Sequence, residues 1–412
     1  MPFRLPLASE MPHPAVFMLL IVPFGAMSGY LNVAVVFLLI QAGVRVDASA
    51  ALVALSYGPQ TWKFLWAPIV DTTLSRKRWY LIGSAVSAIG IYALGAMTAV
   101  ESSLGLLSLI VLLSSFASTF QAMASESLMA YCTAEKTKCR AGGWFQAGNL
   151  GGYGLGGGAG LWLSQRVPPP GIGSLAIALA GLACALALLF VREPPMPDHA
   201  ESYGRTLRAL GPDLWQVARS RRGSLALLIC FLPIGTGAAS NLWAGVAGDW
   251  HASAETVALV TGVLGGVVSM FGCLGGGYLA DRMNRKAAYA LYGVLLTLCA
   301  VAMALSPRTE SMYVVFTMTY AVVNGFCYAA FSAVALEAIG RGAAATKYNL
   351  FASLSNMPIG YMTAVHGWAA VRWGAGGMLN CEAVVAVVAV LLFTCVAALA
   401  TRSSPDARGR SV

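Results

Sequence analysis

Two ionisable residues, Lys63 and Glu126, stand inside long runs of apolar residues, where a charge is costly. Burial disfavours the charged form of a carboxyl group, whereas a nearby lysine favours it. A carboxylate–lysine pair whose contact changes between two states can therefore take up a proton in one state and release it in the other. We interpret Glu126 as a candidate proton-exchanging group and Lys63 as its partner, which could also meet an anionic solute.

The positions of the two residues within their runs indicate a similar depth. Lys63 lies eight residues before Asp71, and Glu126 lies about seven residues before the end of its run. With a helix rise of about 1.5 Å per residue, each lies roughly 10–12 Å inside. Two alternatives stay open: a purely structural ion pair between helices, and a Lys63 side chain that reaches back to the polar surface.

A second set of charged residues occurs twice in the chain. Asp71 precedes Arg76 in WAPIVDTTLSRKR, and 210 residues later Asp281 precedes Lys286 in GYLADRMNRK with the same spacing. The tripeptides Pro-Phe-Gly at 23–25 and Pro-Ile-Gly at 233–235 are also 210 residues apart. Matches at one fixed offset indicate an internal repeat.

The composition indicates that lipid surrounds most of these segments. Of 412 residues, 58% are hydrophobic and 10% are charged, and the mean hydropathy is +0.71. A soluble protein carries about 25% charged residues. About 20 apolar residues cross the ~30 Å hydrocarbon core of a bilayer, and many such runs are present. We therefore expect an all-α membrane protein whose partner is the lipid bilayer.

The apolar runs, bounded by Gly, Pro and charge, predict twelve transmembrane helices. They are placed at 14–41, 48–70, 79–99, 104–133, 141–165, 172–191, 224–248, 255–280, 287–305, 312–338, 343–369 and 378–401. The long polar interval divides them into six plus six. We predict an N-terminal half at 1–191, a cytoplasmic linker at 192–223 and a C-terminal half at 224–412, the parallel-repeat architecture of many transporters.

Lys and Arg in the loops predict the orientation. With a cytoplasmic N-terminus, that side collects 21 of the 26 Lys and Arg residues and the opposite side four. Such an excess marks the cytoplasmic side, so both termini are expected there. The net charge of +9 is then a consequence of topology, and a nucleic-acid partner is not needed to explain it.

The second charged stretch resembles a known signature. GYLADRMNRK at 277–286 resembles the loop motif of the major facilitator superfamily, Gly-x-Leu-Ala-Asp-Arg-x-Gly-Arg-Arg/Lys, with Asn284 as its one departure. In that family the loop latches the cytoplasmic helix ends, and its aspartate bonds to neighbouring helix termini. The resemblance implies a conformational gate in both copies, although basic loops also serve topology alone. The gate residues would be Asp71, Arg76, Asp281, Arg282, Arg285 and Lys286.

Two further stretches resemble the AmpG-like branch of this superfamily. KFLWAPIVD at 63–71 is similar to its Lys-Phe-Leu-Trp-x-Pro-x-x-Asp motif. ATKYNLFASLSN at 345–356 is similar to the opening of its eleventh helix, with Lys347 in place of Gln and Asn349 in place of Ala. Relatives in that branch import muropeptides, siderophores or acetyl-CoA. The compact twelve-span form looks more like the siderophore permeases.

The resemblance also ranks the amides within the runs. Helices one, four, seven and ten line the central cavity in this superfamily, which favours Asn32, Gln121, Asn241 and Asn324 as solute ligands. The alternative is that each amide only bonds to a neighbouring helix. Of the remaining ionisable residues, we expect His366 to be structural and Glu337 and Glu382 to lie at the interface near helix ends.

The sequence predicts neither a cofactor nor a metal. The nine cysteines include no CxxC pair. GGYGLGGG at 151–158 has the glycine spacing of a dinucleotide loop, but that interpretation requires a preceding strand, and the stretch lies within a predicted span. Dense glycine there favours close helix packing.

These observations predict a secondary transporter rather than an enzyme. The expected protein is a multi-pass monomer of the bacterial inner membrane that takes up a small organic solute, a siderophore or muropeptide-like compound, by proton symport. Efflux by proton antiport and a non-transporting membrane sensor are the alternatives. No GxxxxGK(S/T) motif suggests ATP hydrolysis, and the spans hold no nucleophile–base or paired-histidine cluster.

Overall fold

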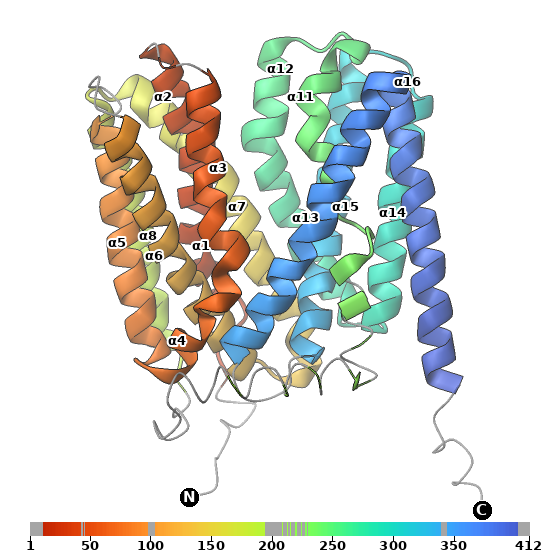
Figure 1. Cartoon of the computed structure of the whole chain (residues 1–412), viewed down its shortest axis with the longest axis horizontal. Coiled ribbons are helices and arrows are strands. Elements are labelled where there is room, and N and C mark those ends of the chain that lie inside the picture. The colour runs from red at the N-terminus through yellow and green to blue at the C-terminus, as the bar shows by residue number, and fades with distance from the viewer. Residues whose placement is uncertain are drawn as a thin grey trace, which may run out of the picture.

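The helices of the chain run between two ends of a bundle. The structure is a computed structural model that describes residues 11–42, 44, 46–97, 104–193, 230–338 and 344–402, with scattered positions between 208 and 228. The described residues are helical almost throughout, and none of them forms a strand. In Figure 1, α1–α8 form one group and α11–α16 a second group beside it. The all-α fold class is confirmed.

The first group begins with a helix that includes one π-helical segment, Tyr30–Val35. Its helices are α1 (Ala15–Gly29), α2 (Val36–Gln41), α3 (Val46–Trp62), α4 (Ala67–Thr72), α5 (Arg76–Met97), α6 (Leu104–Tyr131), α7 (Lys138–Arg166) and α8 (Pro170–Ala183), which continues as the 3₁₀ segment Cys184–Phe190.

The second group consists of α11 (Trp243–Val246), α12 (Ala254–Ala258), α13 (Gly265–Ala280), α14 (Arg285–Leu305), α15 (Glu310–Ala338) and α16 (Ala344–Arg402). The long helix α16 reverses direction at Gly374, whose φ of 67° and ψ of −171° suit glycine alone. Asp249 accepts the backbone N–H of Ala375 at 3.1 Å, which caps the returning helix. Two predicted spans therefore lie antiparallel within this one element (Figure 1).

Eight helical segments of the described chain are long and apolar enough to cross a membrane. The last of them, Tyr348–Val396, covers two predicted runs. Three predicted runs are not among the eight. A helix break interrupts the run at 48–70, dense glycine lowers the hydropathy of the run at 141–165, and a non-helical segment interrupts the run at 224–248. The structure is compatible with twelve spans, and that number stays a prediction. The division at 192–223 also stays one, because most of this interval lies outside the described residues.

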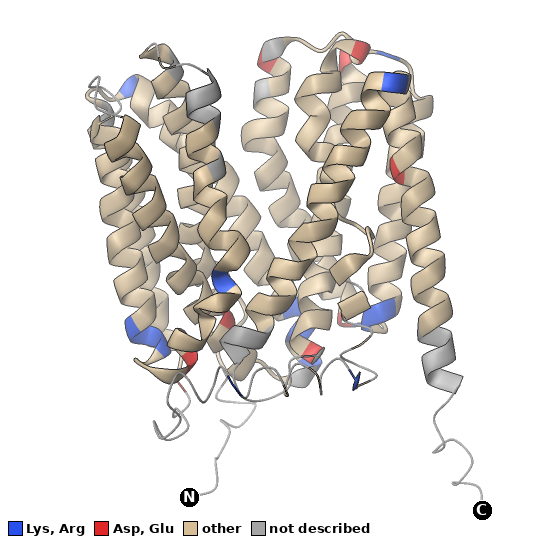
Figure 2. Ribbon diagram, viewed as in Figure 1, with Lys and Arg blue, Asp and Glu red and all other residues tan. Residues whose placement is uncertain are grey.

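Lys and Arg gather at one end of the bundle, the lower end in Figure 2. We call the end formed by residues 71–78, 132–140 and 281–286 the basic end, and the opposite end the far end. Helix α16 starts and finishes toward the basic end (Figure 1). This distribution is the one expected from the loop charges, since 71–78 and 281–286 carry the repeated charged stretches.

Helix α7 packs against α1 in its own group and against α13 and α15 in the other. The stretch 151–158 lies wholly within this helix, which agrees with rejecting it as a nucleotide loop. Glycines let the backbones approach: a Cβ on Gly143 would lie 2.9 Å from the Cα of Gly277, and one on Gly266 would lie 2.8 Å from the Cα of Gly154. Small residues of this kind permit close contact between membrane helices, here along the seam between the two groups.

Candidate functional site

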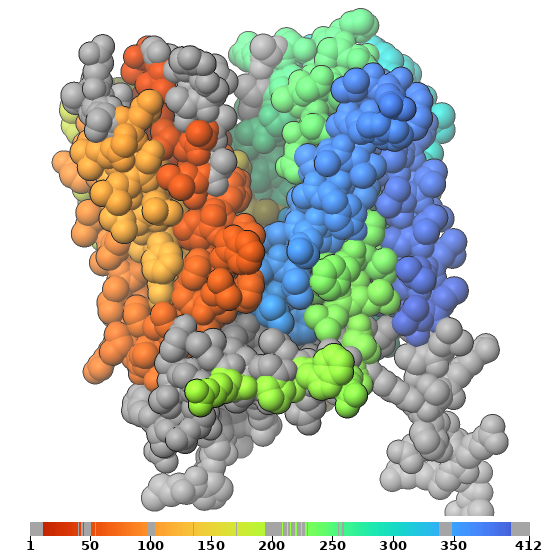
Figure 3. Space-filling view, viewed as in Figure 1, coloured from red at the N-terminus to blue at the C-terminus, as the bar shows by residue number. Residues whose placement is uncertain are grey.

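A central cavity of about 360 Å³ lies between the two groups. Its lining comes from α3, α7, α13, α15 and the segment around α11, and includes Tyr57, Tyr153, Asn241, Tyr320 and Asn324. In Figure 3 the surface is hollowed between the two groups toward the far end. The arrangement allows a solute to contact both groups at once.

A second cavity of about 170 Å³ contains Lys63 and Glu126. Leu150 and Tyr328 line both cavities, so the two adjoin. Lys63 Nζ donates to Glu126 Oε1 at 2.9 Å, and the two residues are only 7% and 4% exposed. Sequence reasoning placed them at one depth; the structure joins them in a buried ion pair. A buried pair of this kind is costly to break by removing one partner.

A break in the second predicted span orients Lys63. The helix α3 ends at Trp62, a 3₁₀ turn covers Lys63–Leu65, and α4 begins with Pro68 in its first turn. Proline lacks an N–H and clashes with a preceding helical turn, so a continuous α-helix is disfavoured here. Trp66 Nε1 donates to Thr119 Oγ1 at 3.0 Å, which ties the break to α6, the helix that carries Glu126. Both the helix break and the Lys63 side chain are therefore bonded to α6.

The other group reaches the same carboxylate. The side chain of Asn349, in the first turns of α16, hydrogen-bonds Glu126, and Tyr348 beside it donates to Ser332 Oγ at 3.4 Å. Asn349 is fully buried. Sequence reasoning did not select Asn349 as a site residue; the available signal was that it stands where the AmpG-like pattern has Ala. The ion pair therefore lies at the junction of the two groups.

The four predicted amides differ in their placement. Asn241 and Asn324 line the central cavity, and Asn241 Nδ2 donates to Thr363 Oγ1 at 3.0 Å. Asn32 lies in the π-helical segment and donates to the hydroxyl groups of Tyr57 and Tyr153 at 2.9 and 3.4 Å. Both tyrosines line the cavity, so Asn32 stands directly behind it. The role of these amides as ligands stays a prediction.

Gln121 is the exception among the amides. Its Nε2 donates to Tyr80 Oη at 3.2 Å, and that hydroxyl in turn donates to the carbonyl oxygen of Leu20 at 3.0 Å. Gln121 is fully buried among α1, α5 and α6 and is not among the residues that line the described cavities. Gln121 therefore lines none of these cavities, and its role as a solute ligand stays a prediction.

At the basic end, Asp281 joins the two groups. Its Oδ1 accepts the backbone N–H of Arg140 at 3.2 Å, and its Oδ2 lies 3.3 Å from the Nε of the same residue. Burial raises the pKa of the Asp281 carboxyl, and the contacts with Arg140 lower it. The first turn of α7 supplies the N–H, and helix N-termini favour an anion. The family motif implies a bond from this aspartate to a neighbouring helix terminus, and Arg140 is the partner here; the role of Asp281 as a gate residue stays a prediction.

Of the other basic residues of the second copy, Arg285 also hydrogen-bonds the Cys139 thiol of α7 in the first group, and the gate roles of Arg282, Arg285 and Lys286 stay predictions. Arg285 pairs with Glu337 at 3.0 Å, joining α14 to α15. The guanidinium of Arg282 lies over the Tyr278 ring at 4.1 Å and donates to its hydroxyl. Lys286 follows Asn284, whose side chain accepts the N–H of Lys286 and caps α14. Capping of α14 therefore explains why Asn stands at position 284, the one departure from the family motif.

The first copy is arranged differently. Arg76 is 2% exposed, its Nε donates to Ser127 Oγ at 2.8 Å, and its guanidinium lies 4.4 Å from the centre of the Tyr131 ring. Glu193 accepts the Arg76 N–H at 2.6 Å and so caps α5. Arg76 therefore bonds within the first group among the described contacts. Asp71 lies half-buried in α4 near this end, and its gate role stays a prediction.

Two further contacts between the groups were not foreseen, one at the basic end and one beside the second cavity. Lys138 Nζ donates to the carbonyl oxygen of Leu336 at 3.0 Å, and Gln146 Nε2 donates to Ser332 Oγ at 2.9 Å. Both run from α7 to α15. Together with Asp281 and the Gly143–Gly277 contact, they join the two groups from the basic end to the second cavity, while the far end is hollowed.

The predicted span at 224–248 is not one continuous helix. Residues 232–237 are non-helical, and Gly235 and Gly237 have φ of 62° and 67°. Pro233 removes a backbone donor, and positive φ is open mainly to glycine. Expecting a helix throughout was therefore wrong at this point. The matching Pro23 lies inside the uninterrupted helix α1. The two copies of the repeat therefore differ in backbone conformation at this point.

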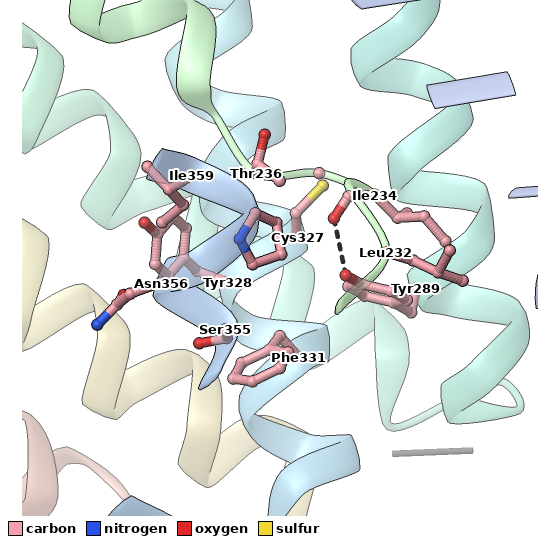
Figure 4. A pocket seen from close by; sticks show the side chains of 12 residues that line it. Leu232, Ile234, Thr236, Tyr289, Cys327, Tyr328, Phe331, Ser355, Asn356 and Ile359 are labelled. Atoms are coloured by element: carbon pink, nitrogen blue, oxygen red, sulfur yellow. Dashed lines mark hydrogen bonds between the residues drawn. The ribbon is translucent and has the colours of Figure 1, made fainter. Parts of the chain in front are cut away.

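A small cavity of about 40 Å³ adjoins this break. Figure 4 shows Thr236, Cys327, Tyr328 and Asn356 around it, with Tyr289 Oη donating to the carbonyl oxygen of Ile234 at 2.7 Å. That bond satisfies a carbonyl group which the break leaves outside a helix. The cavity is too small for an organic solute, and it belongs to the packing of the break.

The remaining ionisable residues give one correction. Glu382 was expected at the interface near a helix end; it is instead 5% exposed and accepts the hydroxyl proton of Tyr320. The reversal at Gly374 starts its helix earlier than the predicted run, so Glu382 lies more than two turns inside. Glu337 is half-buried in its pair with Arg285, and His366 is fully buried. Among the described residues, no group of three or more His, Cys, Asp or Glu could hold a metal ion.

Solved structures share this fold. The E. coli fucose:proton symporter FucP superposes with a TM-score of 0.68 at 15% identity, covering 93% of this chain and 98% of that chain. The human organic anion transporter MFSD10 gives 0.67 at 16% identity, with 92% and 98% covered. The proton:xylose symporter XylE gives 0.68 at 13% identity, with 92% and 95% covered. At these identities the likeness shows the fold alone.

Comparison of the sequence with family profiles identifies the family of this chain. A comparison with curated proteins gives no significant match. The family profile described as Major Facilitator Superfamily matches residues 15–361, which is most of the chain. The AmpG-like branch is not shown by these comparisons. The chain is a multi-pass membrane transporter rather than an enzyme, and it belongs to the Major Facilitator Superfamily.

Proposed function

We propose that this transporter takes up an anionic organic solute together with a proton. The observation that carries the proposal is the buried pair of Lys63 and Glu126, 2.9 Å apart in a cavity that adjoins the central one. This pair is the described ion pair most deeply enclosed by the membrane-spanning helices. Intramembrane ionisable residues mark solute and proton pathways.

The pair couples the two bound species through charge. In the present arrangement the lysine and the carboxylate neutralise each other. An anionic group of the solute that binds Lys63 competes with Glu126 for the ammonium. A carboxylate that loses its partner would be a buried uncompensated charge, and binding a proton removes that cost. The solute anion and the proton are then bound together, which is the requirement for symport.

Contacts from the second group make the pair sensitive to the transport state. Asn349 hydrogen-bonds Glu126 from α16, whereas Lys63 and Glu126 both belong to the first group. Movement of one group against the other therefore changes the environment of the carboxylate. A solute or proton shifts a conformational equilibrium only by its differential affinity for the two states. Because the Asn349 hydrogen bond to Glu126 depends on the relative position of the groups, it can make the proton affinity of Glu126 differ between the states.

Orientation follows from the loop charges. We take the basic end as cytoplasmic, so the hollowed far end faces outward and the structure represents an outward-open state closed by Asp281, Lys138 and Gln146. Both termini then lie on the cytoplasmic side of a bacterial inner membrane. FucP has also been solved in an outward conformation, with a TM-score of 0.66 to this chain.

For the solute we propose the chemistry of the AmpG-like branch. KFLWAPIVD at 63–71 supports this assignment, because it contains Lys63 itself and the proline that breaks the helix after it. A siderophore or a muropeptide-like compound carries carboxylate or phenolate groups that an ammonium can bind. The central cavity of about 360 Å³ accommodates one compact organic group.

Uptake into proteoliposomes tests the proposal. The probes are a ferric siderophore chelate, a muropeptide fragment, and fucose as a neutral compound. We expect an imposed pH gradient to drive accumulation of one anionic probe and not of fucose. Glu126→Gln should abolish this accumulation but keep counterflow without a gradient, because a neutral amide mimics the protonated acid. Accumulation of none of the anionic probes would overturn the assigned solute class.

The matched control is Glu310→Gln, which changes a half-buried glutamate at the far end that accepts from Ser253. It should leave both accumulation and counterflow unchanged. Normal accumulation by Glu126→Gln would remove Glu126 from the coupling mechanism. Loss of both activities in Glu126→Gln, with the control intact, would identify the Lys63–Glu126 pair as structural.

A further inference from the structure

A second carboxyl group lies buried in the other half of the molecule. Glu382, in the returning part of α16, is 5% exposed. It is eight residues beyond Gly374, roughly 12 Å along the helix from the far end. Its Oε1 accepts the hydroxyl proton of Tyr320 on α15, and its Oε2 is buried without a described hydrogen-bond partner.

Tyr320 contacts both Glu382 and the central cavity. Tyr320 lines that cavity and is itself 1% exposed. Trp243, which also lines the cavity, packs edge-on against the Tyr320 ring with centroids 5.2 Å apart. The tyrosine hydroxyl is therefore held toward Glu382, while part of the same side chain borders the central cavity.

The surroundings of Glu382 differ from those of Glu126. The titratable groups that interact with it are Tyr320 and the thiols of Cys299 on α14, Cys327 on α15 and the adjacent Cys381. Among the described residues, Glu382 forms no ion pair with Lys, Arg or His, whereas Glu126 pairs with Lys63. A buried carboxylate without a counter-charge is costly, and such a group neutralises by binding a proton.

We propose that Glu382 and Tyr320 form a second proton-binding site, connected to the central cavity through the tyrosine hydroxyl. In loading, a cavity hydronium ion gives a proton to the tyrosine oxygen while the original tyrosine O–H bond breaks and its proton joins Glu382. Release is the reverse, so no net charge stays on the tyrosine. The part played by this site in transport rests on the proposed proton coupling; its protonation does not.

Infrared spectroscopy of the purified transporter tests the site without any solute. A protonated carboxyl group gives a C=O stretching band that a carboxylate lacks. At neutral pH we expect such a band in the wild type, its loss in Glu382→Gln and its persistence in Glu126→Gln. If Glu382→Gln does not fold, Tyr320→Phe provides the same assignment, because removal of its hydrogen bond should shift the band. A band unchanged in both Glu382→Gln and Tyr320→Phe would overturn the proposal.

Exchange into D2O tests the connection to the cavity. The band should shift as deuterium replaces the bound proton, and Tyr320→Phe should slow this exchange at least tenfold. The control is Tyr313→Phe, on the same helix, whose hydroxyl bonds to the carbonyl oxygen of Trp243 and not to Glu382. Equal exchange rates in wild type and Tyr320→Phe would exclude the tyrosine as the connection. Because no solute is used, these results are independent of whether Glu126 couples transport.

Discussion

The carboxylate of Asp281 accepts the backbone N–H of Arg140 at 3.2 Å and lies 3.3 Å from its guanidinium Nε. One residue after the end of α13 thereby holds the first turn of α7. The N–H groups of a first helical turn lack intrahelical acceptors, so the bond satisfies a group that would otherwise need water. The contact exists only while the two groups touch at the basic end.

Replacing Asp281 should therefore open the basic end. Asp281→Ala removes both the acceptor and the charge, whereas Asp281→Asn keeps an acceptor oxygen for the Arg140 N–H, so we expect a larger effect from alanine. The reporter is Cys139, which is fully buried beside Asp281. Its labelling by a maleimide added at the basic end should rise several-fold in Asp281→Ala.

Two variants make the labelling interpretable. Cys139→Ser gives the background from the other cysteines, and Arg282→Gln changes a neighbouring cation that bonds only to Tyr278 among the described contacts. Arg282→Gln should label less than Asp281→Ala, because the described contacts of the Arg282 side chain lie within its own group. Labelling of Asp281→Ala at the wild-type level would show that this contact does not hold the basic end closed.

Glycine packing provides a second test of the same closure. A Cβ on Gly277 would lie 2.8 Å from the carbonyl oxygen of Cys139 and 2.9 Å from the Cα of Gly143, so Gly277→Ala should force α7 and α13 apart and expose Cys139. Two residues earlier, a Cβ on Gly275 would meet Phe326 at 3.6 Å, an ordinary contact. Gly275→Ala is the control. Equal Cys139 labelling in the two variants would contradict the importance of this contact.

The sequence alone predicted those features that follow from a single residue type or a short motif. Lys63 and Glu126 stood out because a charge in an apolar run has few ways to be satisfied, and their equal depth followed from helix rise alone. Asp281 was identified by a motif. The apolar runs were long enough to predict an all-α membrane fold without knowledge of any contact.

Partners across the seam could not be read from the chain. Arg140 and Asn349 belong to helices far in sequence from Asp281 and Glu126, and although Asn349 departs from the Ala of the AmpG-like pattern, nothing in the chain pairs either residue with its partner. Glu382 was placed wrongly because the last apolar run was predicted to begin at residue 378, whereas the chain already reverses at Gly374. The returning helix therefore starts earlier, and a shift of about one turn separates a buried position from an interfacial one.

The break at 232–237 should be intolerant of side chains. Gly237 has φ of 67°, and a Cβ there would lie between 2.5 and 2.7 Å from the side-chain atoms of Asn324. A left-handed residue with a Cβ costs about 1–2 kcal/mol, so Gly237→Ala should lose at least that much stability. Gly245→Ala, whose Cβ would meet nothing within 4 Å, should not. Thermal unfolding in detergent compares them, and equal midpoints would contradict the strain.

The buried pair allows a separation of stability from coupling. Removing one partner leaves an uncompensated charge, a loss of about 3–5 kcal/mol, whereas apolar replacement of both is often neutral or stabilising. Lys63→Met should therefore lower the unfolding temperature, and Lys63→Met/Glu126→Leu should restore it to near the wild-type value. Proton-driven accumulation should be absent from both, because neither retains the lysine for the solute anion.

The full thermodynamic cycle, including Glu126→Leu alone, identifies the interaction. Neighbouring residues give a non-additive result, whereas independent sites add. We expect the double variant to be more stable than the sum of the two single changes predicts, by more than about 1 kcal/mol. Additive losses would mean that Lys63 and Glu126 do not stabilise each other. Accumulation by the stable double variant would separate the pair from transport altogether, since the fold would be intact and both charged groups absent.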